Sequence, residues 1–332
     1  MGEESKSFNS EQKNIIRENW NKPLLKFLQK KLNERLIYMG LPSSSAEDIQ
    51  QWIDFIKSVI AFQCRVYKSA SDASQSREEI EKLEEILRRL ERERKLENFV
   101  VYDGYLEEVI LRGFDNSPNE IVFSQNGLVT LYNLDFCNDI ASPIEFVDKE
   151  GNFRTAYKFD AIKELLNIQK KICNVSDKFI FLLTVHCSYN GKELEQFLNN
   201  PPNEMIKEYL DKYHKLSGAE RNARIVRLFF TYLIHQSFPH NGFTPQILPA
   251  IIYDGLMGTP LLHFVVLGTA TQGNAGDTPI FQQFNEVINQ KFIKITDEAF
   301  TNSDDQVAEE SGVGIDPIAL FTQSNTYKKL WV

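Results

Sequence analysis

One stretch near the amino terminus, Leu36–Gln63, most constrains the fold of this chain. It begins with a short apolar run, is broken by Gly40, Pro42 and three serines, and continues with apolar residues at helical spacing before a second apolar run over 59–62. This order predicts a strand, a tight turn, a helix over 49–56 and a second strand. The start of the helix would lie beside the carboxyl end of the first strand, where backbone N–H groups can hold a polar, nucleotide-like ligand.

Strands and helices alternate along the rest of the chain. The order indicates an α/β fold with a mostly parallel, seven-stranded, Rossmann-like sheet covered by helices on both faces. The last two strands are close enough in sequence to be antiparallel. The further strands are predicted from apolar runs over 99–104, 128–136, 179–185, 247–253 and 261–267, and the helices from apolar spacing over 75–96, 158–172, 192–199, 203–216 and 219–236.

The pattern divides the chain into three parts. Residues 1–35 form an N-terminal helical segment, with a second helix opening near Pro23, which lies against the sheet or covers its ligand cleft. Residues 36–295 form the α/β domain, with a helical insertion at about 192–236 before the last strand pair. Residues 296–332 are acidic and rich in small side chains, which predicts a flexible tail.

Composition narrows the class of protein. The chain has 332 residues, 42% of them hydrophobic, and no apolar run that approaches the roughly 18 residues of a membrane helix. Its polar, acidic N-terminus resembles neither a secretory signal nor a transit peptide, and its four cysteines form no CxxC pair, so we expect a cytoplasmic protein with no membrane segment. A net charge of −9 argues against a surface built throughout for nucleic acid.

Seven strands in this order, with a helical insertion before the final pair, resemble the fold of the class I S-adenosylmethionine-dependent methyltransferases. The resemblance implies a cofactor held at the ends of the first three strands. The turn after the first strand would meet the methionine part, Gln63 stands where an acidic residue commonly binds the ribose hydroxyls, and Asp103 with Gly104 matches the position that meets the adenine amino group. The residues of the turn are Met39, Gly40, Leu41, Pro42 and Ser43.

The chemistry of methyl transfer asks mainly for proximity, with a base where a proton must leave. Asp135, at the end of the fourth strand, is the first candidate for that base and Asp139 is the second, although either carboxylate could instead cap the turn after the strand. The resemblance therefore implies a methyltransferase of unknown acceptor. Because only Gly40 remains of the family's glycine-rich turn, the alternative is a methyltransferase-like fold that has lost its cofactor and acts as a binding or regulatory subunit.

Partner binding has two candidate segments. The charged helix over 75–96 is either a partner-binding coiled coil or an amphipathic helix with a solvated outer face, and its few apolar layers favour the second interpretation. The acidic C-terminal tail is either a docking segment or a loosely ordered terminus. A basic stripe of Arg221, Arg224 and Arg227 fits a phosphate-binding edge or, as we favour, a solvated helix face.

Other kinds of active site find little support in the sequence. His186 and Cys187 are adjacent on an extended segment, so their side chains point in opposite directions and form a poor catalytic couple. His235 and His240 lack the further ligands that a metal site needs, so we predict no metal. The motifs of zinc proteases, serine hydrolases and P-loop NTPases do not occur.

Overall fold

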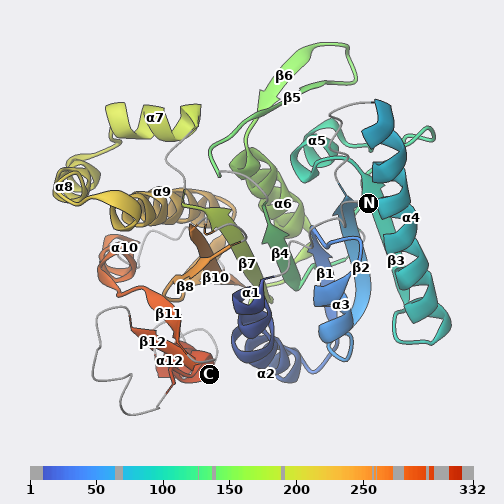
Figure 1. The fold of residues 1–332 in the computed structure, drawn as a ribbon, viewed down its shortest axis with the longest axis horizontal. Helices are drawn as coiled ribbons and strands as arrows, with labels where there is room; N and C mark the ends of the chain where they lie inside the picture. Colours follow the sequence, from blue (N-terminus) through green and yellow to red (C-terminus); the bar gives the residue numbers. More distant parts are fainter. Residues whose placement is uncertain are drawn as a thin grey trace.

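A ten-stranded sheet with helices on both faces forms the centre of the protein (Figure 1). The computed structural model describes residues 10–63, 70–125, 127–136, 140–187, 191–255, 258, 260–271, 280–296, 299–302 and 314–323. The predicted mostly parallel, Rossmann-like α/β architecture is confirmed, although the sheet holds more than the expected seven strands.

The order of the strands creates a switch point beside β1. From one edge the sheet runs β3, β2, β1, β4, β7, β10, β9, β11, β12, with β8 also paired to β10. The first five strands are parallel to one another and β10 is antiparallel to β7. Since the chain leaves β1 toward β2 on one side and later returns to β4 on the other, ligands of such folds bind at the carboxyl ends of these two strands. The bounds are β1 Leu36–Gly40, β2 Ile56–Gln63, β3 Asn98–Asp103, β4 Leu131–Asp135, β7 Lys178–His186 and β10 Pro260–Ala270.

The far end of the sheet departs from the prediction. The run over 247–253 is split into β8 (Phe243–Ile247) and β9 (Ile251–Asp254). Pro249 lies between them, and proline lacks the N–H that a continuous strand would need there. Two further strands, β11 (Ile293–Thr296) and β12 (Ala299–Asn302), extend the sheet beyond β9.

One face of the sheet is covered by the N-terminal segment, by α4 and by a C-terminal helix. Their buried apolar residues, such as Trp20, Leu24 and Leu87, pack with the side chains on that face of the strands, so the predicted amphipathic helix over 75–96 is confirmed as a core-packed element. We call this side the α2 face. Its helices are α1 Glu11–Ile15, the π-helix η1 Ile16–Asn21, α2 Lys22–Leu32, α3 Glu47–Gln51, α4 Ala70–Arg92 and α12 Pro317–Gln323.

The opposite face carries the second core, which is rich in phenylalanine. Here α6 and α9 pack on the strands, and the predicted helices of the insertion appear as α7, α8 and α9. The bounds are α5 Leu106–Arg112, α6 Lys158–Ile172, α7 Lys192–Asn199, α8 Glu204–Tyr213, α9 Gly218–His240 and α10 Ile280–Asn289. In the described structure no helix is long and apolar enough to cross a membrane.

A hairpin that the sequence analysis missed projects from the top of the molecule in Figure 1. It consists of β5 (Ile144–Val147) and β6 (Phe153–Ala156), inserted between β4 and α6. Only Phe146 and Ala156 of its strands are buried, and Phe153 is 87% exposed. So few buried positions leave no clear alternation of apolar and polar residues to recognise.

Two sequence expectations about helices are wrong. The helix expected over 49–56 has only five residues, because Ile56 already begins β2 and its side chain enters the core. The basic stripe is not a solvated face throughout: Arg227 is 1% exposed, and its guanidinium donates to the carbonyls of Ile288 and Gln290 at 2.7 Å. This arginine satisfies carbonyl groups at the end of α10.

Candidate functional site

The strand-end residues singled out in the sequence lie together at one edge of the sheet. Gly40 ends β1 and pairs with Asn133 of β4, while Gln63 and Asp103 end β2 and β3 and pair with each other. Asp135 ends β4 two residues beyond Asn133. The carboxyl ends of these parallel strands therefore place four of the predicted positions along one edge of the sheet. Gly40 lies at the switch point, and Gln63 and Asp103 lie one and two strands away from β1.

The turn after β1 is held tightly against β4. The backbone N–H of Leu41 donates to the Asn133 carbonyl at 3.1 Å, and a Cβ at Gly40 would lie 2.3 Å from the same oxygen. Met39 is fully buried in the core and Pro42 is buried, whereas Ser43 is exposed and lies 2.9 Å from the hydroxyl of Ser45. The glycine is thus required by the close approach of two strands, independently of any ligand.

α3 is a short helix whose first turn is acidic, and a role for its N–H groups in holding a polar ligand stays a prediction. Glu47 and Asp48 open the helix, and both carboxylates form ion pairs with Arg17 of η1. The Arg17 and Asp48 side chains are 7% and 8% exposed. The Arg17 guanidinium therefore lies at the start of α3, where the turn after β1 ends.

The end of β3 is fixed by a loop that the sequence analysis did not single out. Asp115 accepts the backbone N–H of Asp103 at 3.2 Å, and also those of Ser117 and Ile121. Gly104 has φ +146°, and a Cβ there would lie 2.9 Å from the side-chain amide of Asn116. These contacts fix the backbone of Asp103 at the sheet edge, and the residue is 4% exposed. The Asp-Asn-Ser-Pro turn was the available signal for this loop.

Asp135, the first candidate for a catalytic base, forms an ion pair with Lys13 of α1. The two side chains are 20% and 18% exposed. Burial alone would lower the pKa of Lys13, but the charge of Asp135 and its hydrogen bond raise that pKa above its usual value. In this arrangement the carboxylate is engaged by a cation. Asp139, the second candidate, lies outside the described residues.

A row of polar side chains continues from Asp135 across the α2 face. Thr184 of β7, which pairs with Asp135 in the sheet, lies 3.0 Å from Nδ1 of His263, whose Nε2 lies 2.9 Å from Oδ1 of Asn21. Because the Asn21 oxygen can only accept, His263 carries its proton on Nε2 and accepts from the Thr184 hydroxyl at Nδ1. Burial lowers the pKa of His263 to about 4, so the ring is neutral.

The other end of the row reaches β1. The side-chain amide of Asn133 donates to Asp48 at 2.8 Å and to the Tyr38 hydroxyl at 3.3 Å. Burial and the nearby charge of Asp48 raise the pKa of Tyr38 well above its usual value, so the phenol stays protonated. These contacts tie β1, β4 and α3 into one polar network at the switch point.

The N-terminal segment supplies the matching side of this network. Lys13, Arg17 and Asn21 recur every four residues and contact Asp135, Asp48 and His263 respectively. From the sequence we expected this segment to lie against the sheet or to cover its cleft. In the structure α2 packs on the sheet, and α1 and η1 lie over the predicted reacting end at Asp135. The three polar residues were not predicted. Their four-residue spacing was the signal available.

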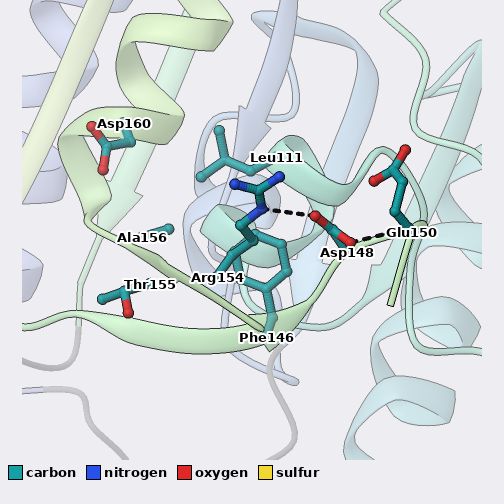
Figure 2. A pocket seen from close by; sticks show the side chains of 8 residues that line it. All are labelled: Leu111, Phe146, Asp148, Glu150, Arg154, Thr155, Ala156 and Asp160. Carbon is teal, nitrogen blue, oxygen red and sulfur yellow. Dashed lines mark hydrogen bonds and ion pairs between the residues drawn. The ribbon is translucent and has the colours of Figure 1, made fainter. Parts of the chain in front are cut away.

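Two surface cavities lie elsewhere. One of about 420 Å³ is bordered by the β5–β6 hairpin, where Arg154 pairs with Asp148 at 2.7 Å, and by Leu111 and Asp160 (Figure 2). The other, of about 560 Å³, lies between α6 and α9. None of the described residues that line either cavity is among the predicted cofactor residues.

The remaining reactive side chains give no second active site in the described structure. Cys187 is buried, and burial raises the pKa of its thiol to about 12, so it is a poor nucleophile. His235 is buried in α9 with Nδ1 at 2.8 Å from the Thr231 carbonyl. The described residues contain no group of three or more His, Cys, Asp or Glu side chains placed to hold a metal ion.

Comparison with known proteins gives similarities at the level of whole structures. The chain resembles an O-methyltransferase from Bacillus cereus solved with SAH (TM-score 0.32, 10% identity, 74% of this chain and 80% of that chain). It also resembles the plantazolicin methyltransferase BamL solved with a triazolic desmethylPZN analog and SAH (TM-score 0.37, 10% identity, 78% of this chain and 87% of that chain). A third similar structure is a putative hemolysin from Streptococcus thermophilus (TM-score 0.36, 11% identity, 81% of this chain and 73% of that chain). No protein-family model and no curated protein matches the sequence. Because these TM-scores are low, the fold assignment rests on the strand order of the sheet.

Proposed function

We propose that the protein binds S-adenosylmethionine at the carboxyl ends of β1, β2 and β3 and transfers its methyl group to an acceptor. The observation that supports this proposal is that Gly40, Gln63, Asp103 and Asp135 lie at the carboxyl ends of four neighbouring parallel strands, along the edge that holds the switch point. In sheets of this topology that edge is where nucleotide-like ligands bind.

The residues present fit the adenosine half of the cofactor. Gln63 and Asp103 end neighbouring paired strands, and their side-chain oxygens can accept hydrogen bonds from hydroxyl and amino groups. The buried setting of Asp103 makes such an interaction strong, because few water molecules compete for the carboxylate. Met39 fits less well, since its side chain is directed into the core, and the cofactor-binding role of the turn through Ser43 stays a prediction.

Bound S-adenosylmethionine would supply an electrophilic methyl group. The chain's own contribution is then to hold the acceptor nearby and to accept a proton where one must leave. Asp135 is the residue we propose for that proton, and it becomes able to accept it when Lys13 leaves the carboxylate. Asp139 stays the second candidate.

A second candidate function is favoured by the same ion pair. A methyltransferase-like protein that has lost its chemistry and binds other proteins could keep Asp135 permanently paired with Lys13. Binding through the apolar side of α4 is not available to such a protein, because Ile80, Leu83, Leu87 and Leu90 are buried against the sheet. The outer charged face of α4 and the segment over 296–332 stay the candidate sites for a partner, and a nucleic-acid partner is not favoured because Arg227 is buried.

Thermal unfolding with and without S-adenosylhomocysteine, the demethylated product, tests the proposal. Ligand at about 100 times its dissociation constant stabilises a one-site protein by about 2.7 kcal/mol, which raises the melting temperature by a few degrees. A saturable rise that adenine alone does not produce supports cofactor binding. An unchanged melting temperature over the full range of ligand concentration favours the protein-binding alternative.

A further inference from the structure

The two ends of the N-terminal helical segment are held in different ways. In α2, Leu24, Leu25 and Leu28 are 1% exposed or less and pack in the core of the α2 face. In α1 none of the residues Glu11–Ile15 is buried, and Ile15 only borders that core. Since buried apolar area is what holds a helix on a sheet, α1 should separate from the sheet far more readily than α2.

The described contacts between α1 and the sheet are mainly polar. Lys13 pairs with Asp135, and the Gln12 side-chain oxygen accepts the backbone N–H of Asp254 at 2.8 Å. Ser10 caps the start of α1 through the Lys13 N–H at 3.2 Å, a bond within the segment itself. When the helix moves away, water can replace each of the two contacts with the sheet. Hydrogen bonds to water then compensate for most of the free energy of the lost contacts.

The boundary between the two ends is a change of helix type. η1 follows α1 directly, and π-helical turns are rare and concentrate at functional sites. η1 is firmly anchored: Trp20 is fully buried, Arg17 pairs with Asp48, and Asn21 contacts His263. The junction between Ile15 and Ile16 therefore separates a weakly held turn from a firmly held one.

We propose that α1 is a lid over Asp135, which opens at the junction of Ile15 and Ile16 while η1 and α2 stay packed on the sheet. In the closed position Lys13 covers and neutralises the carboxylate. In the open position Asp135 faces solvent and an acceptor can approach the end of β4. The use of this opening for acceptor entry rests on the proposed function, whereas the opening itself does not.

Hydrogen exchange measured by mass spectrometry tests the opening in the full chain. In Lys13→Gln we expect the hydrogen-bonded amides of residues 14–16, read in a peptide spanning 11–16, to exchange about tenfold faster than in the native protein, with those of 24–32 unchanged. Lys22→Gln is the matched control, since Lys22 pairs with Glu18 within the same segment at 2.8 Å. Unchanged exchange over 11–16 in Lys13→Gln, or equal acceleration over 11–16 and 24–32, would overturn the proposal.

Carbodiimide chemistry tests the cover over Asp135 without cofactor or acceptor. In the native protein we expect a zero-length cross-link between Lys13 and Asp135, detected as a joined peptide. With a small external amine, Asp135 should be labelled several-fold faster in Lys13→Gln than in Lys22→Gln. No cross-link, or equal labelling in the two variants, contradicts a lid at this position. Neither readout uses S-adenosylhomocysteine, so failure of the lid and failure of the proposed function are distinguishable.

Discussion

The guanidinium of Arg17 and the carboxylate of Asp48 form a buried ion pair that joins the N-terminal segment to the turn after β1. Asp48 also accepts the side-chain amide of Asn133, so one carboxylate links the segment, α3 and β4. This contact makes the segment an integral part of the switch-point edge.

Removing one member of this pair should be costly. We expect Asp48→Ala to lower the free energy of unfolding by about 3 kcal/mol, because it removes the buried carboxylate that pairs with the buried Arg17 guanidinium. Urea unfolding measures the change. Glu18→Ala is the control: its ion pair with Lys22 is about 40% exposed on both sides and should contribute less than about 1 kcal/mol. Equal losses in the two variants would show that the buried ion pair stabilises the fold no more than the exposed one.

The neutral state of His263 predicts a pH dependence of stability. Its folded pKa of about 4 lies below the 6.5 of an exposed histidine, so the unfolded chain binds the proton first as the pH falls. The free energy of unfolding therefore decreases between pH 6.5 and pH 4, and this group alone should remove about 2 kcal/mol between pH 7 and pH 5. In His263→Gln, urea unfolding at the two pH values should show a loss smaller by that amount. The same loss in variant and native protein would contradict the buried, neutral ring.

Close packing at the switch point makes Gly40 sensitive to enlargement. A methyl group there would lie 2.3 Å from the Asn133 carbonyl and 2.8 Å from the Tyr38 hydroxyl, so we expect Gly40→Ala to destabilise the fold by at least about 1–3 kcal/mol. In Gly127→Ala the nearest atom would be Ile37 Cδ1 at 3.7 Å, an ordinary contact. Thermal or urea unfolding of both variants checks the difference, and a stable Gly40→Ala protein would mean that the two strands are farther apart than the structure shows.

The strand-end positions could be predicted because buried parallel strands leave a strong sequence signal. Continuous apolar runs that end in a polar residue located Gln63, Asp103 and Asp135 at the edge where they are found. α3 was predicted to be too long because Trp52 and Ile56 fit helical spacing, although Ile56 belongs to a strand. Tertiary packing overrode the local pattern there.

The polar network over these strand ends could not be predicted in the same way. Lys13 and Asp135 are 122 residues apart and Asn21 and His263 are 242 residues apart, so no local pattern joins them. On a helix, a lysine, an arginine and an asparagine at four-residue spacing also fit an ordinary solvated face. Only the three-dimensional structure shows that their partners are Asp135 at the end of β4, Asp48 in α3 and His263 in β10.

Calorimetric titration with S-adenosylhomocysteine, using the native protein, Asp103→Asn and Asp148→Asn, measures whether the ends of β2 and β3 hold the cofactor. Asp148 is the control because it lies on the β5–β6 hairpin and pairs with Arg154. The account predicts saturable binding to the native protein and to Asp148→Asn, and binding weaker by about 1–3 kcal/mol, at least fivefold, in a folded Asp103→Asn. No heat of binding with the native protein, or equal affinity in all three proteins, would contradict a cofactor site at the ends of β2 and β3.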